Sequence, residues 1–180
     1  MCIRYGLELV PIQVSLTQPE CMRAFTALPV ESKFENTIVF NARDYHQLID
    51  CPIMVSESDT ATFMVANTKV YIETYFNGEE YGYADLIKKE IQPSMEAVAT
   101  FTDSLPLDEY HFIMYIRDGL EFMKTIQSKE VGIIKKAKTA IENVTLFGMG
   151  ALEHGNSSFY TLTDFGDSSY TSMIKRVALH

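Results

Sequence analysis

The chain has 180 residues, of which 47% are hydrophobic and 22% charged, and its formal net charge is -9 at pH 7. This length suits one medium domain or a small domain with part of another, and the composition is too apolar for a disordered protein. The negative charge argues against nucleic acid and against an anionic membrane as partners, because both need a basic protein face. No apolar run approaches the roughly 18 residues of a membrane helix.

The three cysteines, Cys2, Cys21 and Cys51, form no C-x-x-C pair and are odd in number. Idle thiols are therefore favoured over a disulfide framework or a cysteine zinc site. The first six residues lack the apolar core and the cleavage site of a signal peptide. Localisation is left open, and a longer parent with its own signal could belong to the periplasm or cell envelope.

Residues 1–50 have the pattern of β-structure. Three apolar residues alternate with polar ones, as in a half-buried strand that Pro19 ends: Ile12, Val14 and Leu16. Residues 34–40 are a second strand candidate with a continuous apolar end. Because few strands fit into 50 residues, we expect the closing part of a β-sandwich.

A domain boundary is expected at residues 48–54. Pro52 holds the preceding residue extended and cannot donate to a central sheet ladder. A polar run, residues 56–60, follows it. The chain is accordingly divided into residues 1–50 and residues 51–180.

The second part alternates strands and helices. Residues 70–76 alternate in polarity and end at the turn-forming pair Asn77-Gly78, which predicts a strand. From Ala84 to about Thr102 apolar residues recur every three to four positions, which predicts an amphipathic helix. Pro93 removes one backbone donor there, so we expect a kink or a restarted helix.

Residues 110–116 are almost entirely apolar and predict a strand covered on both faces. His111 within it is expected to be a core or interface residue, because no second histidine or acid stands nearby at a useful spacing. Residues 119–147 are interpreted as an insertion that carries an amphipathic helix. Alternation over residues 158–163 predicts a further strand, and a last helix that Ser168 or Ser169 caps follows it.

Residues 148–158, G-M-G-A-L-E-H-G-N-S-S, contain three glycines around a carboxylate, an imidazole and an amide. By themselves these residues favour a solvated acid, Glu153, in a glycine-rich loop. His154, Asn156 and Ser157 fit local turn chemistry as well as a binding site. On the last helix His180 shares an arc with Met173 and Val177, where an ordinary helix-end residue is the simplest interpretation.

Residues 148–157 resemble the G-G-L-E-H-x-N-S signature of the glycyl aminopeptidase family of zinc peptidases, distant relatives of aminopeptidase N. Residues 48–52 are similar to that family's L-x-D-x-P junction, and residues 105–112 to its L-P-x-x-x-Y-x-F segment. Residues 177–180 resemble the run into its H-E-x-x-H helix. The resemblance spans nearly the whole chain, although Ala151 replaces the second glycine of the signature.

The resemblance implies an α+β fold, in which residues 1–50 end a β-sandwich N-terminal domain. Residues 51–180 would be the mixed β-sheet half of a thermolysin-like metallopeptidase domain. A peptide-binding edge strand and its turn would comprise Gly150, Ala151, Leu152, Glu153, His154, Asn156 and Ser157. The family assigns to Glu153 the catalytic-site role of holding the free α-ammonium of the peptide substrate. His180 would be the first zinc ligand of an aminopeptidase, which hydrolyses peptide bonds near the substrate N-terminus.

The sequence ends at His180, before the family's general-base glutamate, its other two zinc ligands, the C-terminal helical half of the catalytic domain and the PDZ-like module of many members. One imidazole is not a zinc site, so zinc is expected in the full-length parent and only weakly on this chain. Two hypotheses follow. The chain is a fragment of a zinc aminopeptidase that is inactive alone, or it is a truncated, non-catalytic peptide-binding remnant.

Overall fold

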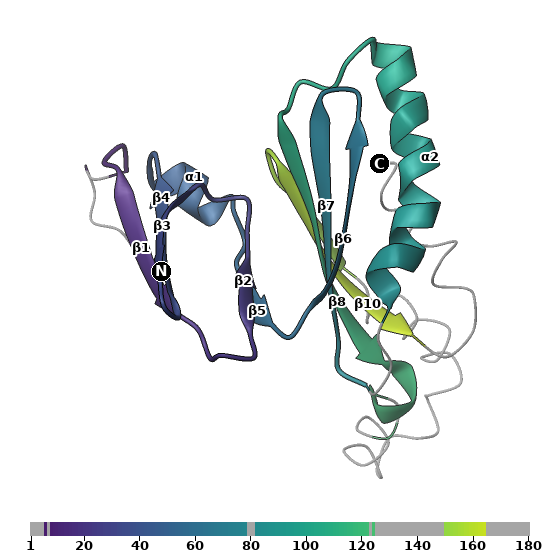
Figure 1. Cartoon of the computed structure of the whole chain (residues 1–180), viewed down its shortest axis with the longest axis horizontal. Helices are drawn as coiled ribbons and strands as arrows, with labels where there is room; N and C mark the ends of the chain where they lie inside the picture. The colour runs from purple at the N-terminus through teal and green to yellow at the C-terminus, as the bar shows by residue number, and fades with distance from the viewer. Residues whose placement is uncertain (1–5, 7, 79–81, 123, 125–149, 165–180) are drawn as a thin grey trace, which may run out of the picture.

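The computed structural model describes residues 6, 8–78, 82–122, 124 and 150–164. Within these residues the chain forms ten strands and two complete helices, and residues 119–122 and 124 are also helical (Figure 1). The N-terminal part comprises β1 (Ile12–Thr17), β2 (Arg23–Phe25), β3 (Val30–Phe34), β4 (Thr37–Ala42), α1 (Tyr45–Ile49) and β5 (Met54–Ser56). The C-terminal part comprises β6 (Asp59–Val65), β7 (Thr68–Phe76), α2 (Tyr83–Thr102), β8 (Glu109–Asp118), β9 (Gly150–Glu153) and β10 (Ser157–Asp164).

The N-terminal part contains an antiparallel sheet in the order β1-β4-β3. The alternating burial of β1 confirms the first predicted strand. The predicted strand over residues 34–40 is confirmed for its apolar end, which lies in β4, but its first part is corrected, because β3 ends at Phe34 and β4 begins at Thr37. Glu35 has a φ of 49°, so the chain turns there with Asn36, a residue type favoured in turns. The β-sandwich itself stays a prediction.

Helix α1 lies where the sequence predicted only a boundary. Its N-cap residue Asp44 accepts the backbone N–H of Gln47 at 2.8 Å, a local contact that an aspartate at a helix start makes well. The strand β5 follows Pro52 and pairs antiparallel with β2. Neither element was predicted, because α1 has only five residues and β5 three.

The C-terminal part is built on a five-stranded sheet in the order β6-β7-β8-β10-β9. The inner pairs β7–β8 and β8–β10 are parallel, and the outer pairs are antiparallel, so the sheet is mixed. Strand β7 confirms the prediction for residues 70–76, since Val70 and Ile72 are fully buried on one face. Strand β6 was missed, although Ala61, Phe63 and Val65 alternate with exposed residues.

Helix α2 covers one face of this sheet, on the side away from β1, β3 and β4 (Figure 1). It confirms the predicted helix, but it is one continuous helix through Pro93, so the expectation of a restart is wrong. Buried residues on both sides of Pro93, Ile91 before it and Ala99 after it, hold the two halves on one apolar surface. At its start, Ala84 donates its N–H to the Asp59 carboxylate at 2.9 Å.

Strand β8 is buried on both faces, as the sequence predicted. The described residues are mostly strands with few helices, which confirms the α+β class. None of the helices among them is long and apolar enough to cross a membrane. The helix of the expected insertion, the last helix, Cys2 and His180 lie outside the described residues.

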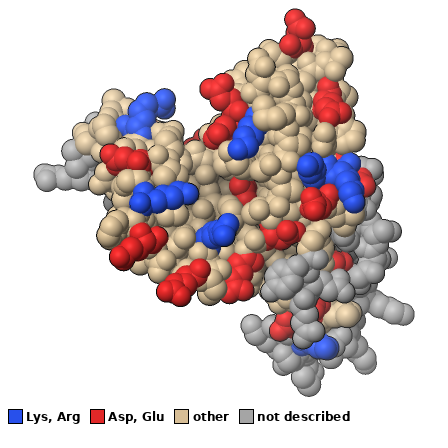
Figure 2. Space-filling model, viewed as in Figure 1, with Lys and Arg blue, Asp and Glu red and all other residues tan. Residues whose placement is uncertain are grey.

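Charged side chains of both signs are interspersed over the face of the molecule in Figure 2. The exclusion of nucleic acid and membrane partners stays a prediction.

The described cysteines, Cys21 and Cys51, are free thiols, and burial raises the pKa of the Cys51 thiol to about 11.

Candidate functional site

Strand β9 lies at one end of the five-stranded sheet as the structure describes it. It pairs antiparallel with β10, in the register Glu153 with Ser158 and Ala151 with Tyr160. All four residues of β9 are exposed, and Leu152 keeps 62% of its surface accessible. Within the described residues, the glycine-rich stretch therefore contains a short edge strand with exposed side chains and no strand paired to its outer side.

Glu153 points to the sheet face that carries α2. Side chains alternate between the faces of a strand, and the cross-strand partner of Glu153, Ser158, shares its face with the core residue Tyr160. The hydroxyls of Tyr110 and Ser158 are hydrogen-bonded to each other. Burial raises the pKa of Tyr160 to about 12, and the nearby Glu153 charge adds to this increase. Glu153 thus lies beside a cluster of hydroxyl groups.

The turn from β9 to β10 is held by Asp50 of the N-terminal part. One carboxylate oxygen, Oδ1, lies 3.0 Å from Nδ1 of His154, and the other, Oδ2, accepts the N–H of Gly155 at 2.9 Å. Next to it, the thiol of Cys51 lies 3.9 Å from the side-chain oxygen of Asn156. These contacts join segments that are about a hundred residues apart in the sequence.

The backbone carbonyls of the remaining predicted site residues, Asn156 and Ser157, accept hydrogen bonds from within the chain. The Asn156 carbonyl accepts the N–H of His111 at 3.1 Å, and the Ser157 carbonyl accepts the N–H of His154 at 2.8 Å. Ser157 is fully buried, and its hydroxyl has no hydrogen-bond partner within the described structure. Gly150, Ala151, Leu152 and Glu153 therefore lie on the open strand, whereas His154, Asn156 and Ser157 form its anchored end.

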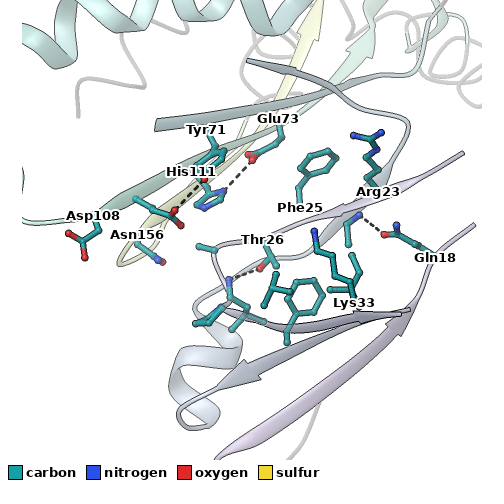
Figure 3. A pocket seen from close by; sticks show the side chains of 18 of the residues that line it. Gln18, Arg23, Phe25, Thr26, Lys33, Tyr71, Glu73, Asp108, His111 and Asn156 are labelled. Atoms are coloured by element: carbon teal, nitrogen blue, oxygen red, sulfur yellow. Dashed lines mark hydrogen bonds and ion pairs between the residues drawn. The ribbon is translucent and has the colours of Figure 1, made fainter. Parts of the chain in front are cut away.

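The opposite face of the sheet borders a cavity of 1040 Å³ between the two parts of the chain (Figure 3). Its C-terminal wall carries a buried pair in which Glu73 Oε1 lies 3.2 Å from His111 Nδ1. The His111 ring stacks on Tyr71 with 4.6 Å between the ring centroids. Arg23 and Lys33 line the cavity from the N-terminal part.

His111 is thus the core and interface residue that the sequence predicted. Its acidic partner was missed, because Glu73 comes from the neighbouring strand β7. The register that places Tyr71 opposite His111 brings Glu73 to the same face two residues later. The signal for this pair was Glu73, the single charged residue of the segment 70–76.

A metal site is not formed by the described residues, which contain no group of three His, Cys, Asp or Glu that could hold an ion. The predicted first ligand, His180, lies outside them. The assignment of His180 to zinc therefore stays a prediction.

The fold is similar to that of an aminopeptidase N family protein from Idiomarina loihiensis, with a TM-score of 0.67 at 17% identity. That similarity covers 98% of this chain and 28% of the other, so this chain spans less than a third of its length. A mutant two-domain M1 zinc metallopeptidase bound to L-arginine gives a TM-score of 0.42 at 10% identity, over 92% of this chain and 32% of its own. No curated protein sequence matches the chain. The first 57 residues match the Peptidase M61 N-terminal domain.

Proposed function

We propose that β9 binds the N-terminal end of an extended peptide, and that the chain is part of a zinc-dependent aminopeptidase of the glycyl aminopeptidase type. The observation that carries this proposal is the place of Glu153 on an exposed edge strand. The match of residues 1–57 to a peptidase N-terminal domain supports the peptidase class.

The peptide would bind by strand addition. An edge strand presents unpaired backbone N–H and C=O groups, and an extended peptide can satisfy them with its own backbone. The glycine at position 150 leaves open space beside the backbone, since nothing lies within 4 Å of a Cβ placed there. Strand addition fixes the direction and the register of the peptide, so that one end of it lies next to Glu153.

Glu153 would then receive the free α-ammonium of the peptide through a charge-assisted hydrogen bond. This contact limits how far the peptide can slide along β9, which is the requirement for cleavage near the N-terminus. The hydroxyls of Tyr110 and Ser158 keep the surroundings of Glu153 polar on the same sheet face. Glu153 therefore acts in binding and orientation of the substrate.

Zinc belongs to the longer parent protein in this proposal, with His180 as its first ligand. When bound, zinc would supply the activated water that hydrolyses the peptide bond. The mixed sheet and α2 would form the sheet half of a thermolysin-like catalytic domain, and the helical half would be supplied by the parent. The described residues of this chain provide the peptide-binding strand.

The test is the affinity of a fluorescent alanine pentapeptide, labelled at its C-terminus, measured by fluorescence anisotropy. We expect Glu153→Gln to weaken binding of the peptide with a free N-terminus by about tenfold, because a hydrogen bond to a charged group is lost. The N-acetylated peptide has no ammonium, so its weaker binding should be the same for the wild type and the variant.

The matched control is Glu31→Gln, which makes the same chemical change on β3 of the other sheet. It should leave the affinity for both peptides unchanged. Equal binding of the free and acetylated peptides by the wild-type chain would remove the ammonium-binding role of Glu153. Absence of any binding by the wild type would overturn the assignment of β9 as a peptide site.

A further inference from the structure

We propose that Asp50 is a positioning residue for β9, so that the N-terminal part of the chain sets the geometry of the peptide-binding strand. The effect on peptide affinity rests on the proposed function of β9, whereas the effect on the strand itself does not. The proposal gives the region that matches the Peptidase M61 N-terminal domain a direct role at the site.

The contact between the two parts uses both oxygens of one carboxylate. Oδ1 of Asp50 lies 3.0 Å from Nδ1 of His154, and Oδ2 accepts the backbone N–H of Gly155 at 2.9 Å. The hydrogen bond from Gly155 is the main reason why the pKa of Asp50 lies below its ordinary value. The anionic form of Asp50 is thus stabilised by the turn that it holds.

Gly155 lies so close to Asp50 that a side chain at this position would require the carboxylate to shift by a few tenths of an ångström. A Cβ built on Gly155 would lie 3.2 Å from Oδ2 of Asp50, which is tighter than ordinary van der Waals contact. The backbone of Gly155 does not have the positive φ that favours glycine, so its conformation does not require this residue type. The close approach of the Asp50 carboxylate supplies the physical reason for a glycine here.

The turn is the point from which β9 can be positioned. Among the described strands β9 pairs only with β10, whereas β10 also pairs with the buried strand β8. His154, which Asp50 contacts, directly follows Glu153 in the sequence. A change at Asp50 therefore acts on the anchored end of β9, one residue away from the proposed ammonium-binding carboxylate.

Amide hydrogen exchange of the intact chain tests the positioning without any ligand. We expect Asp50→Ala to speed exchange at Gly155 and along β9 by about tenfold, because the turn loses both acceptors. Gly155→Ala should have the same effect from the other side of the contact. Asp50→Asn keeps one acceptor and gains a donor for the imidazole, so it should restore most of the protection.

Affinity for the free alanine pentapeptide tests the consequence for binding. Asp50→Ala and Gly155→Ala should each weaken it by about fivefold to tenfold, and the double variant should be no weaker than either single one, because both break one contact. Asp50→Asn should recover most of the affinity. The control Glu31→Ala removes an exposed carboxylate of β3, outside α1 and the β9–β10 turn, and it should leave peptide affinity unchanged.

Wild-type exchange rates at Gly155 and β9 in Asp50→Ala would overturn the proposal. So would faster exchange with wild-type peptide affinity, because the contact would then not position the binding strand. If the wild-type chain binds no peptide, the proposed function fails, and the exchange rates of β9 alone decide whether Asp50 holds the strand.

Discussion

Two aspartates of the N-terminal part stabilise backbone turns in the same way. Asp44 accepts the N–H of Gln47 at the start of α1, and Asp50 accepts the N–H of Gly155 after β9. In each case this backbone hydrogen bond is the main cause of a pKa below the ordinary carboxyl value. The first contact joins residues 3 positions apart and the second joins residues 105 positions apart. In both contacts a carboxylate accepts a backbone N–H.

The lowered pKa of Asp50 predicts how its contribution to stability changes with pH. The folded-state pKa lies below the ordinary value of 3.8, so between the two values the unfolded chain binds more protons. The contribution is therefore fully present above the ordinary value and is lost as the pH falls through the folded-state pKa. Urea unfolding of wild type and Asp50→Asn should give a difference in unfolding free energy that shrinks from about pH 5 to about pH 2.

Asp44→Asn is compared in the same measurement, since the pKa of Asp44 is lowered by the N-cap hydrogen bond that begins α1, the helix whose C-cap is Asp50. Its difference from the wild type should shrink in the same range without any change in Gly155 exchange. A constant difference between wild type and Asp50→Asn down to pH 2 would show that the carboxylate form of Asp50 does not matter for the contact.

At the residue scale, the sequence predicted the place of Glu153 better than the place of Asp50. The alternation over residues 158–163 indicated strand β10, whereas the edge strand around Glu153 was expected only from the family resemblance. The link from Asp50 to His154 depends on how the two parts pack, which no periodicity contains. Residues 48–52 and 148–157 are separate motifs in the sequence, and in the structure Asp50 of the first contacts His154 and Gly155 of the second.

At the scale of elements, α2 carries a proline that its own hydrogen bonding does not favour. Pro93 lacks a backbone N–H and is exposed within a helix of 20 residues. We expect Pro93→Ala to raise the unfolding free energy by about 2 kcal/mol, because the interior-helix cost of proline outweighs the entropy that proline removes from the unfolded chain. Thermal unfolding followed by circular dichroism would measure the increase.

Ser94→Ala is the neighbouring control, since it changes a helix position without adding a backbone donor, and it should shift stability by less than about 0.5 kcal/mol. A lower melting temperature for Pro93→Ala would mean that the helix bends at Pro93 to fit the sheet and that a straighter helix packs less well.

The elements that the sequence predicted well are those whose burial alternates or repeats along the chain. Strands β1 and β7 and helix α2 carry that pattern, and β8 was predicted from its continuous apolar run. Strand β6 also alternates and was nevertheless missed. Strand β3 is exposed throughout, so its sequence has no hydrophobic alternation, and the turn at Glu35 was merged into one strand. Strand β5 has three residues and is defined by its pairing with β2, which a local pattern does not report.

At the scale of the whole molecule, the five-stranded sheet uses its two faces differently. One face is apolar and packs on α2 through residues such as Ile72, Ile87 and Met114. The other carries Glu73 and His111 and borders the cavity toward the N-terminal part. The Glu73 oxygen Oε2 is buried and has no hydrogen-bond partner in the described structure. The Glu73–His111 pair thus lies at the border between the two parts, where apolar side chains would be buried at a lower desolvation cost.

The Glu73–His111 pair therefore gives a prediction about the packing of the two parts. Glu73→Ala should lower the unfolding free energy by about 3 kcal/mol, because His111 loses its partner in a buried site. Replacement of both residues by apolar ones, Glu73→Leu with His111→Phe, should be close to the wild type or more stable. As a control, Glu109 is an exposed acid that accepts a hydrogen bond from Tyr71, the ring that stacks on His111. Glu109→Ala should change the unfolding free energy by less than about 0.5 kcal/mol.

Urea unfolding monitored by circular dichroism compares these variants directly. A single variant as stable as the wild type would show that the pair is hydrated through the cavity, since a solvated carboxylate contributes little. A destabilised double variant would instead mean that polar side chains at positions 73 and 111 are required for the packing of the N-terminal part on the five-stranded sheet. The predicted order, with the double variant at or above the wild type and Glu73→Ala below it, holds only if the pair is buried away from solvent.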